Sequence, residues 1–323
     1  MGRAFPGANI SRIRLMALPF KTPLPTPDEL SAARARVAEL TGGRYVITGE
    51  LGRGGMSRVF LGWDNIGRRQ VALKVLADNA SDTIEGRERF RREAMITSGI
   101  EHPHIVACDG FIQQGKTTVA VMRYVAGKTL DHRIRVGRWQ DPAQLVSILA
   151  SLADALDCIH RRGVVHRDIK PANILLRTAD DWPFLTDFGI ATLATSEHSR
   201  SEVAKKFGTP EYMSPEQALG AWDADHRSDI YSLGLVAYRA LAGRLPFEGA
   251  TPLAQAAQRA ALDPQPLRRL APDVSPRLAQ VIDRCLAREP RRRWRDAATL
   301  REELVALTRP AGMFDRVFGS RLW

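Results

Sequence analysis

The stretch of sequence that decides the fold lies near the middle of the chain and reads Val164-Val165-His166-Arg167-Asp168-Ile169-Lys170-Pro171-Ala172-Asn173-Ile174-Leu175-Leu176. Apolar residues at its two ends, 164–165 and 174–176, predict short buried strands. Between them, Pro171 removes a backbone donor and fixes φ, so the charged residues are expected on a loop. A loop held at both ends by core strands can bring a carboxylate, an ammonium and an amide close to one substrate atom.

Three side chains of this loop suit the transfer of a charged group. Asp168 could accept a hydroxyl proton, Lys170 could neutralise developing phosphate charge, and Asn173 could bind a metal. For this motif alone the alternative is a charged surface turn, because a single motif is only a hypothesis. Other motifs in the chain have to decide between the two interpretations.

Segment 166–173 resembles the catalytic loop of the eukaryotic-type (Hanks-type) serine/threonine protein kinases. The resemblance implies an α+β, bilobal protein-kinase-like fold with a small β-rich N-lobe and a large helical C-lobe. It also implies that Asp168, Lys170 and Asn173 are the catalytic residues. Further motifs extend the resemblance over residues 44–308, and two of them are most like those of bacterial members.

A glycine-rich segment, 50–60, lies between two apolar runs that are typical of strands. Glycines on a hairpin let the backbone approach a polyphosphate, whose oxygens the N–H groups can then cradle. Gly52, Gly54 and Val59 match the kinase glycine-rich loop, whereas Ser57 replaces its third glycine. Because a strand follows, the segment is not the strand-to-helix turn of a dinucleotide-binding fold.

The next predicted strand, 70–76, is apolar except for one lysine. Alternation places Lys74 on the same face as the small Ala72, opposite the larger apolar residues. Kinase-like sequences carry their ATP-binding lysine in this Val-Ala-x-Lys setting. The alternative is a solvated lysine at a sheet edge.

A charged helix is predicted over 85–98. Within it, Glu93 matches the glutamate that pairs with the lysine in active kinases. An intrahelical pair with Arg89 is the alternative, and both pairs could form in different states of a switch.

Residues 110–117 fit the P-loop pattern GxxxxGK[ST] letter for letter. A P-loop requires a helix N-terminus after its lysine, to aim N–H groups at phosphate. Here the β-branched run 117–122 predicts a strand instead. We therefore interpret residues 114–116 as the turn of a hairpin.

The end of that strand, 122–127, resembles the kinase hinge, with Met122 as the gatekeeper of the nucleotide pocket. The resemblance directs the backbone of Arg123 and Val125 toward the adenine base. Arg123 stands where related sequences often carry glutamate. The ATP-binding residues that the resemblance implies are Leu51, Gly52, Arg53, Gly54, Gly55, Met56, Ser57, Val59, Ala72, Lys74, Glu93, Met122, Arg123, Val125 and Leu175.

Residues 187–189 match the Asp-Phe-Gly motif, at the end of a short predicted strand. In kinases the aspartate of this motif holds the metal that bridges the nucleotide phosphates. Asp187 and Asn173 are therefore the implied metal ligands. Their oxygens suit Mg²⁺, with Mn²⁺ as an alternative.

The polar run 190–207 is predicted to be a mobile loop. In kinases with an Arg-Asp pair such as Arg167 and Asp168, a phosphorylated activation loop docks on the arginine. Ser199 and Ser201 are the candidate phosphorylation sites.

The end of this region, 208–216, resembles the end of a kinase activation segment. There Thr209 matches the position that helps to shape the acceptor site. Asp229 matches the aspartate that braces the catalytic loop, and Arg293 matches the arginine that pairs with the Glu216 position.

Composition narrows the function classes. The formal charge of the 323-residue chain is +11, but its arginines are scattered apart from the short run 291–293, so we expect no nucleic-acid binding. Three cysteines without a CxxC pair indicate a reducing compartment. No apolar run looks long enough to span a bilayer, and no signal peptide is evident. We expect a cytoplasmic protein without a transmembrane segment.

A long amphipathic helix over 142–162 should be the central helix of the C-lobe. A shorter helical pattern ends at Leu40, and this region or the C-terminal tail could dock on a partner or on the domain itself. A loosely ordered leader is the alternative for the N-terminal region. The predicted organisation is an N-terminal extension (1–43), a kinase domain (44–308) with N-lobe 44–121, hinge 122–127 and C-lobe 128–308, and an apolar, basic tail (309–323).

The sequence thus predicts an ATP- and Mg²⁺-dependent kinase that phosphorylates Ser or Thr hydroxyls of protein substrates and autophosphorylates its activation loop. The competing class is a pseudokinase, in which the same fold acts as a scaffold or ligand sensor. Retention of Lys74, Asp168, Asn173 and Asp187 argues against that class. A small-molecule phosphotransferase is a third interpretation, and the complete activation segment weakens it.

Overall fold

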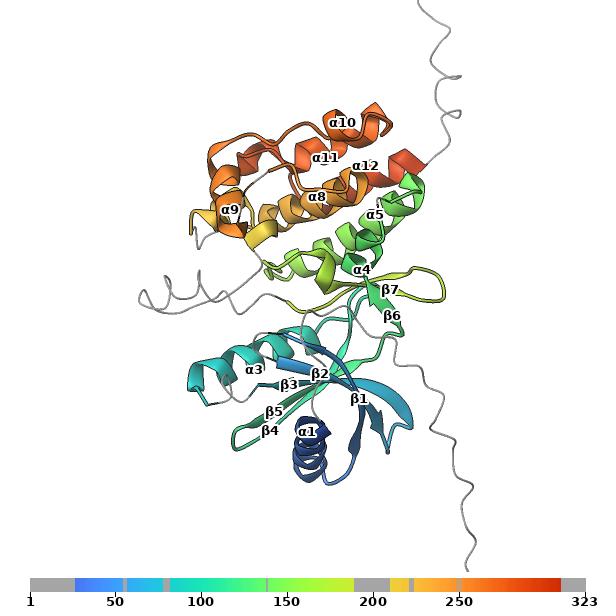
Figure 1. Cartoon of the computed structure of the whole chain (residues 1–323), viewed down its shortest axis with the longest axis vertical. Helices are drawn as coiled ribbons and strands as arrows, with labels where there is room; N and C mark the ends of the chain where they lie inside the picture. The colour runs from blue at the N-terminus through green and yellow to red at the C-terminus, as the bar shows by residue number, and fades with distance from the viewer. Residues whose placement is uncertain are drawn as a thin grey trace, which may run out of the picture.

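The computed structural model describes residues 27–308, apart from 55–56, 78–81, 138, 189–209, 221–223, 248 and 250. In these residues the chain forms a smaller lobe around a sheet and a larger lobe of helices (Figure 1). This arrangement agrees with the two-lobed α+β fold that the sequence predicts.

The smaller lobe is built on a five-stranded antiparallel sheet with the strand order β1-β2-β3-β5-β4. Each predicted strand of this region forms. The strands are β1 (Tyr45–Arg53), β2 (Ser57–Asp64), β3 (Arg69–Leu76), β4 (Cys108–Gln114) and β5 (Thr117–Arg123).

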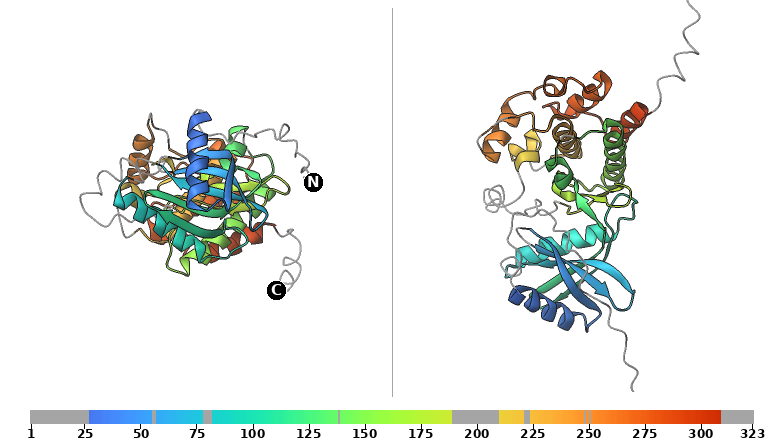
Figure 2. Two further views of the ribbon diagram at one scale, coloured as in Figure 1. Left: turned by 90° about the horizontal axis from the view of Figure 1, so that it is seen from below. Right: turned by 45° about the vertical axis from the view of Figure 1, so that its right-hand side comes forward.

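Two helices cover opposite faces of this sheet (Figure 2). Helix α3 (Ile84–Ser98) begins after Thr83, whose hydroxyl accepts a hydrogen bond from a backbone N–H of the first turn. Helix α1 (Pro27–Leu40) packs on β1, β4 and β5 of the other face. Between the two helices, β3 alternates as predicted, with its larger apolar residues toward α1 and Lys74 toward α3.

The P-loop-like segment is the β4–β5 hairpin. Gln114 pairs with Thr117, and Gly115 takes a positive φ of 57° in the turn between them. Strand β5 follows the lysine directly, so the helix N-terminus that a P-loop needs is not there. The interpretation of this motif as a hairpin turn is confirmed.

The larger lobe is helical, with a small three-stranded sheet of order β6-β7-β8 next to the catalytic loop. Its elements are β6 (Gly127–Thr129), α4 (Leu130–Arg135), α5 (Pro142–His160), the 3-10 helix η2 (Pro171–Asn173), β7 (Ile174–Arg177), β8 (Pro183–Leu185), η4 (Pro210–Tyr212), α7 (Pro215–Ala218), α8 (Arg227–Ala242), α9 (Pro252–Ala261), α10 (Leu267–Leu270), α11 (Pro276–Cys285), η5 (Pro290–Arg292) and α12 (Ala297–Thr308).

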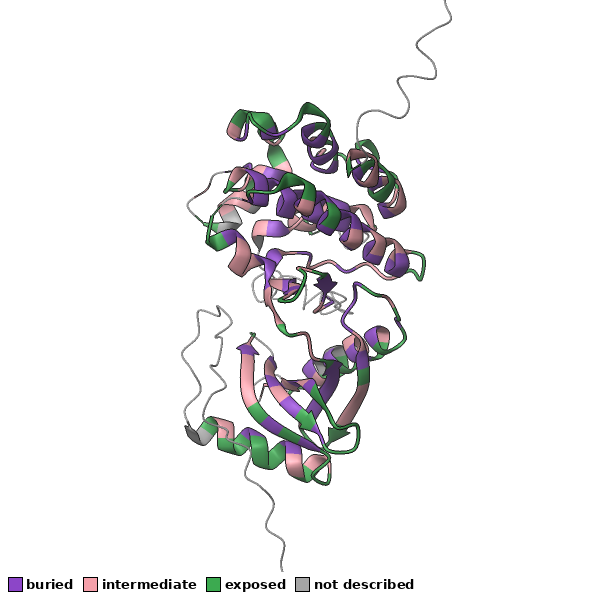
Figure 3. Ribbon diagram, turned by 90° about the vertical axis from the view of Figure 1, so that its right-hand side faces the viewer, coloured by how far each residue is buried: buried purple, intermediate pink, exposed green. Residues whose placement is uncertain are grey.

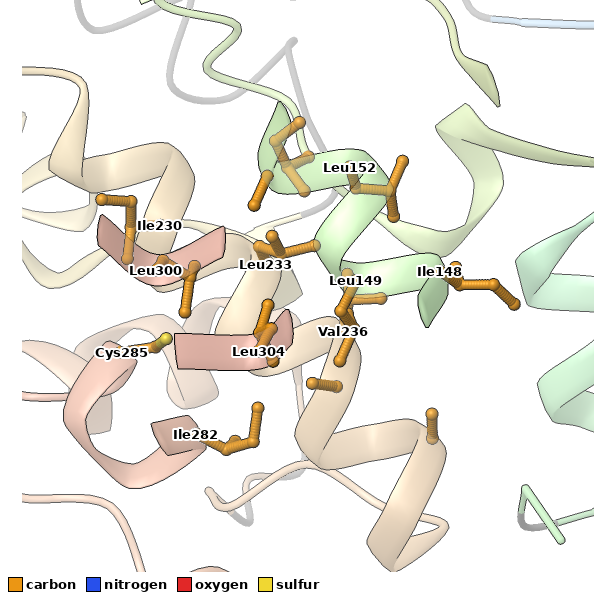
Figure 4. Packing of buried hydrophobic residues seen from close by; sticks show 14 of the residues in the cluster. Ile148, Leu149, Leu152, Ile230, Leu233, Val236, Ile282, Cys285, Leu300 and Leu304 are labelled. Carbon is orange, nitrogen blue, oxygen red and sulfur yellow. The ribbon is translucent and has the colours of Figure 1, made fainter. Parts of the chain in front are cut away.

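Side chains from α5, α8, α11 and α12 meet in one apolar core (Figure 4). Helix α8 lies at its centre and is buried on almost every side. A Cβ atom at Gly234 would lie 2.7 Å from the Cβ of Cys285, so only glycine lets α8 and α11 pack this closely. The burial colours of Figure 3 show the same arrangement, with buried residues on the inner sides of the elements and exposed residues outside.

Helix α5 is long and apolar enough to cross a membrane, so the expectation that no apolar run has this length is wrong. In the structure, 61% of its most apolar window is buried inside the protein. Asp141 caps its N-terminus, and its apolar stripe forms part of the core of the larger lobe. The apolar residues that suggest a membrane span are therefore those that a central core helix requires.

One predicted strand is not formed. The backbone N–H of Val164 donates to the carbonyl oxygen of Ile159 (3.1 Å), at the end of α5. The N–H groups of His166 and Arg167 donate to the carboxylate of Asp229 (both 2.8 Å). Because these donors are already bonded, the segment enters the loop as an irregular connection, whereas 174–176 form the predicted strand within β7.

Candidate active site

A bridged ion pair lies between the two lobes. The ammonium of Lys74 on β3 donates to a carboxylate oxygen of Glu93 on α3 (2.6 Å) and to one of Asp187 after β8 (2.8 Å). Strand alternation and the position of Glu93 on the inner side of α3 bring the three groups together. The predicted lysine–glutamate pair is present in this structure.

Burial and the bridge shift the protonation of these groups in different directions. Burial favours the neutral amine of Lys74, but the two carboxylates outweigh it and raise the pKa of the ammonium. Burial raises the pKa of Glu93 despite Lys74. Burial also opposes ionisation of Asp187, yet Lys74 holds the pKa of this carboxyl below its usual range. The Asp187 side chain is 40% exposed, so this carboxylate can still reach a ligand.

The catalytic-loop residues form a second cluster. Lys170 donates through Nζ to the Asp168 carboxylate (2.8 Å). The side-chain amide of Asn173 donates to the same carboxylate and to the Asp168 carbonyl oxygen, both at 2.9 Å. Helix η2, which begins at Pro171, turns the chain so that the three side chains converge. The structure therefore brings together the three residues predicted to be catalytic.

Asp229 on α8 fixes the backbone of this loop. Its carboxylate accepts from the N–H groups of His166 and Arg167 and faces Nε2 of His160 at 2.8 Å. Burial alone would raise the pKa of Asp229, but these donors hold it below its usual range. Asp229 thus braces the loop as predicted, while the His160 contact was not foreseen because it joins residues 69 positions apart.

Two residues of the site take a left-handed backbone conformation. Arg167 has φ 66° and Asp187 has φ 55°, a region that residues other than glycine rarely adopt. His166 precedes Arg167 and contacts the residues on both sides of Asp187. Its ring stacks on Phe188 at 4.7 Å between centroids, and its Nε2 lies 3.2 Å from the carbonyl oxygen of Thr186. Burial lowers the pKa of His166 and keeps the ring neutral. Such strained positions cluster at functional sites.

Residues of the predicted nucleotide site form a row across the five-stranded sheet of the smaller lobe. Gly52 pairs with Val59, and Val59 pairs with Lys74. The N–H of Gly54 donates to the carbonyl oxygen of Ser57 (2.8 Å) and closes the turn. Gly55 and Met56, also predicted to bind ATP, lie outside the described residues.

An apolar cluster lies next to this row. It contains Ala72, Met122, Val125 and Leu175, all predicted from the resemblance, on three different elements and the hinge. Two further members, Val106 and Phe184, were not predicted; both are almost fully buried and complete the cluster. An apolar surface of this kind suits a flat base.

The backbone N–H of Arg123 donates to the carbonyl oxygen of Ala107 (2.9 Å), and the guanidinium lies 5.5 Å from the ring centroid of Phe184. That the backbone at Arg123 and Val125 faces the base stays a prediction. Behind Met122, a cavity of about 10 Å³ between Lys74 and α3 leaves room for no more than a water molecule.

A third charged cluster lies next to the catalytic loop, within the larger lobe. Arg293 donates to both carboxylate oxygens of Glu216 (2.7 Å each), and this pair was predicted. Gln217 donates from its side chain to the Arg167 carbonyl oxygen (3.2 Å), which links α7 to the catalytic loop. The predicted regulatory residues Ser199, Ser201 and Thr209 lie outside the described residues.

The donor set fits a hard cation. Asp187 presents a partly exposed carboxylate, and the NH₂ group of Asn173 is directed at Asp168, which leaves its oxygen as an acceptor. No three His, Cys, Asp or Glu side chains gather as a metal site in the described part of the chain. Two oxygen ligands match a cation that keeps several waters and takes phosphate oxygens as well.

Comparisons with known proteins agree with this geometry. The protein kinase domain family matches residues 45–305. The serine/threonine-protein kinase pkn2 of Myxococcus xanthus is 38% identical over 270 residues, which are 82% of this chain and 32% of that protein. The serine/threonine-protein kinase PknB of Mycolicibacterium smegmatis is 39% identical over 267 residues, 81% of this chain and 42% of that protein. The chain thus spans a third to two fifths of the length of these relatives.

Solved structures give the same result for the fold. The crystal structure of the Mycobacterium tuberculosis PknI kinase domain superposes with a TM-score of 0.64 at 30% identity, over 81% of this chain and 96% of that one. The predicted bilobal fold and the resemblance to bacterial Hanks-type kinases are both confirmed. This family generally uses ATP and a divalent metal. Because the family match spans most of the described fold and includes all three charged clusters, we conclude that the chain belongs to the protein kinase domain family.

Proposed function

We propose that the chain is a serine/threonine protein kinase that transfers the γ-phosphoryl group of ATP to hydroxyls of protein substrates, with Mg²⁺ as its metal. The observation that carries this proposal is the Asp168 carboxylate, which Lys170 and Asn173 hold at 2.8 and 2.9 Å. Both donors bond the same oxygen, Oδ2, and so fix the orientation in which this carboxylate can accept a proton. The proposed domain is 44–308, and we place it in the cytoplasm.

Each residue of the site has a role in this proposal. Asp168 orients the acceptor hydroxyl and takes its proton, while Lys170 stabilises charge on the phosphoryl group as it moves. Lys74, held by Glu93, binds the inner phosphates. Asp187 and Asn173 would hold Mg²⁺, which when bound neutralises phosphate charge.

The nucleotide and regulatory sites follow the same reasoning. The base would lie against the apolar cluster of Ala72, Met122 and Leu175, and the phosphates under the β1–β2 turn. Phosphorylation of Ser199 or Ser201 by the kinase itself would bring a phosphate to Arg167. Serine and threonine are the proposed acceptors because Lys170 lies beside Asp168.

Transfer of labelled γ-phosphate from ATP to a generic basic protein tests the proposal. We expect Mg²⁺-dependent incorporation on serine or threonine, identified by phosphoamino-acid analysis. Asp187→Asn should lower it on the order of 10²-fold or more, because it removes a metal ligand. Lys116→Ala is the matched control, because Lys116 is 73% exposed and lies in the hairpin that mimics a P-loop.

Either of two results would overturn the proposal. If Lys116→Ala abolishes phosphate incorporation, the β4–β5 hairpin contributes to phosphate binding. Nucleotide binding without incorporation would favour the pseudokinase.

A further inference from the structure

Helix α1 lies before residue 45, where the family match begins, yet it is part of the folded smaller lobe. Val37 is fully buried and Ala33 is 4% exposed, in one cluster with Tyr45 and Ile47 of β1. Figures 1 and 2 show α1 across the sheet face opposite to α3. The position of α1 is thus set by the same apolar core that sets the position of β1.

Polar contacts fix the helix along β1. The guanidinium of Arg34 donates to the carbonyl oxygens of Ile47 (3.1 Å) and Thr48 (3.3 Å). At the end of the helix, the Thr41 hydroxyl accepts from the Tyr45 N–H (3.2 Å). These contacts hold the first turn of α1 beside the far end of β1, where the glycine-rich turn begins.

Two arginines face each other at that end. Arg53 on β1 and Arg58 on β2 are register partners, the last pair before the turn. Like charges directly opposite each other in a sheet are destabilising. The Arg53–Arg58 end of the β1–β2 pairing is therefore destabilised unless negative charge lies between the two guanidinium groups.

Two carboxylates supply that charge, and one of them comes from α1. Glu50 on β1 lies 2.6 Å from the Arg58 guanidinium and 3.5 Å from that of Arg53. Glu29 in the first turn of α1 lies 2.9 Å from Arg53 and 3.9 Å from Arg58. The Arg58 and Glu50 side chains are only 16% and 10% exposed, so solvent screens this cluster less than it screens an isolated surface pair.

We propose that Glu29 is a positioning residue for the nucleotide site: it completes the four-residue ion cluster that holds the paired ends of β1 and β2 together, so that docking of α1 on the sheet tunes the affinity for ATP. This inference rests on the proposed function, because it assigns the hairpin to the ATP phosphates. Glu29 would act on the nucleotide through Arg53 and Arg58, and hence through the ends of β1 and β2 that flank the glycine-rich turn.

The experiment is a titration of the full chain with ATP and Mg²⁺, together with the dependence of phosphate transfer on ATP concentration. Glu29→Gln should weaken ATP binding about three-fold, in the range of a partly exposed ion pair. Glu29→Arg should weaken it further, to about ten-fold, because it places a third cation beside Arg53 and Arg58. In both variants KM for ATP rises while kcat at saturating ATP stays at the wild-type value.

Controls separate this role from a general effect on folding. Glu39→Gln removes an exposed carboxylate from the other end of the same helix and should leave KM for ATP unchanged. The conservative Glu29→Asp keeps a carboxylate beside Arg53 and Arg58 and should keep KM for ATP closer to the wild-type value than Glu29→Gln does. A general loss of helix stability would not follow the charge at this position.

Equal KM values for ATP in wild type, Glu29→Gln and Glu29→Arg would overturn the inference and leave the proposed function intact. So would a fall of kcat without a change of KM. If the wild-type chain binds no nucleotide, the proposed function itself has failed, and the two failures are thereby distinguished.

Discussion

Two ion clusters of this protein each join one cation to carboxylate oxygens, but their surroundings differ. In the cleft, Lys74 is a point charge between Glu93 and Asp187, and the Asp187 side chain is 40% exposed. Within the larger lobe, the Arg293 side chain is fully buried and makes two parallel 2.7 Å hydrogen bonds to Glu216. The same carboxylate of Glu216 also accepts from the hydroxyl of Ser228 (2.7 Å).

The difference between the two pairs lies in the donors and acceptors that remain. Arg293 also donates to three backbone carbonyl oxygens, those of residues 227, 287 and 288, so its guanidinium is bonded on every side. Lys74 keeps an ammonium that can rotate toward a new acceptor, and Asp187 keeps an exposed oxygen. A planar guanidinium with all its donors bonded suits a permanent structural contact. A flexible ammonium suits a site where one carboxylate contact can be replaced by a contact with a ligand. We infer that the Arg293–Glu216 pair stabilises the fold and that the Lys74 cluster serves the proposed nucleotide site.

The largest expected effect is on the stability of the larger lobe. Arg293→Met should lower the free energy of unfolding by about 3–5 kcal/mol, because it leaves the Glu216 carboxylate buried without its partner. Denaturant unfolding measures this loss. The neighbouring Arg292→Met is the control: this side chain is 73% exposed, and its change should stay within about 0.5 kcal/mol. If both variants lose the same small amount of unfolding free energy, the Arg293–Glu216 pair does not stabilise the fold as inferred.

The second effect is on activity. Lys74→Met should lower phosphate transfer about 10²- to 10³-fold, because it removes one preorganised charge at the phosphates. Its loss of stability should be smaller than that of Arg293→Met, since Glu93 already has a raised pKa and can take up a proton. Steady-state transfer and denaturant unfolding of one preparation give both numbers. If Lys74→Met unfolds the protein as far as Arg293→Met does, the lysine is structural.

A smaller effect is the pH dependence of the Glu216 pair. Burial opposes ionisation of Glu216, but Arg293 holds its folded-state pKa below the usual value. A carboxyl with a lowered folded pKa stabilises the protein fully above its unfolded pKa of about 4.3, and this contribution is lost as the pH falls through the folded value. The gap in unfolding free energy between wild type and Glu216→Gln should therefore narrow from pH 7 toward pH 3. A gap that does not change with pH would contradict the ionised pair.

Much of the site could be predicted from the sequence because its residues follow local patterns. Alternation along β3 placed Lys74 on the cleft face, and the proline and charges of the catalytic loop placed Asp168 and Asn173 on a turn. The order of these motifs along the chain then fixed the family. Each inference needed only a few consecutive residues.

The rest depends on contacts between distant residues. Val164 and Val165 have the composition of a strand, but the carboxylate of Asp229, more than sixty residues later, takes the donors of the following loop. Val106 and Phe184 complete the apolar cluster from elements whose pairing no local pattern reveals. The contact of Glu29 with Arg53 likewise depends on how α1 crosses the sheet.

ATP binding by the Lys74 cluster and proton transfer at Asp168 are separate roles, and Asp168→Asn tests this separation most directly. We would measure ATP affinity and phosphate transfer for wild type and this variant under the same conditions. Because Asp168 lies outside the Lys74 cluster, the variant should bind ATP within about two-fold of wild type, yet transfer phosphate about 10³-fold more slowly because it lacks the proton acceptor. Transfer at the wild-type rate, or a loss of binding as large as the loss of transfer, would contradict this assignment.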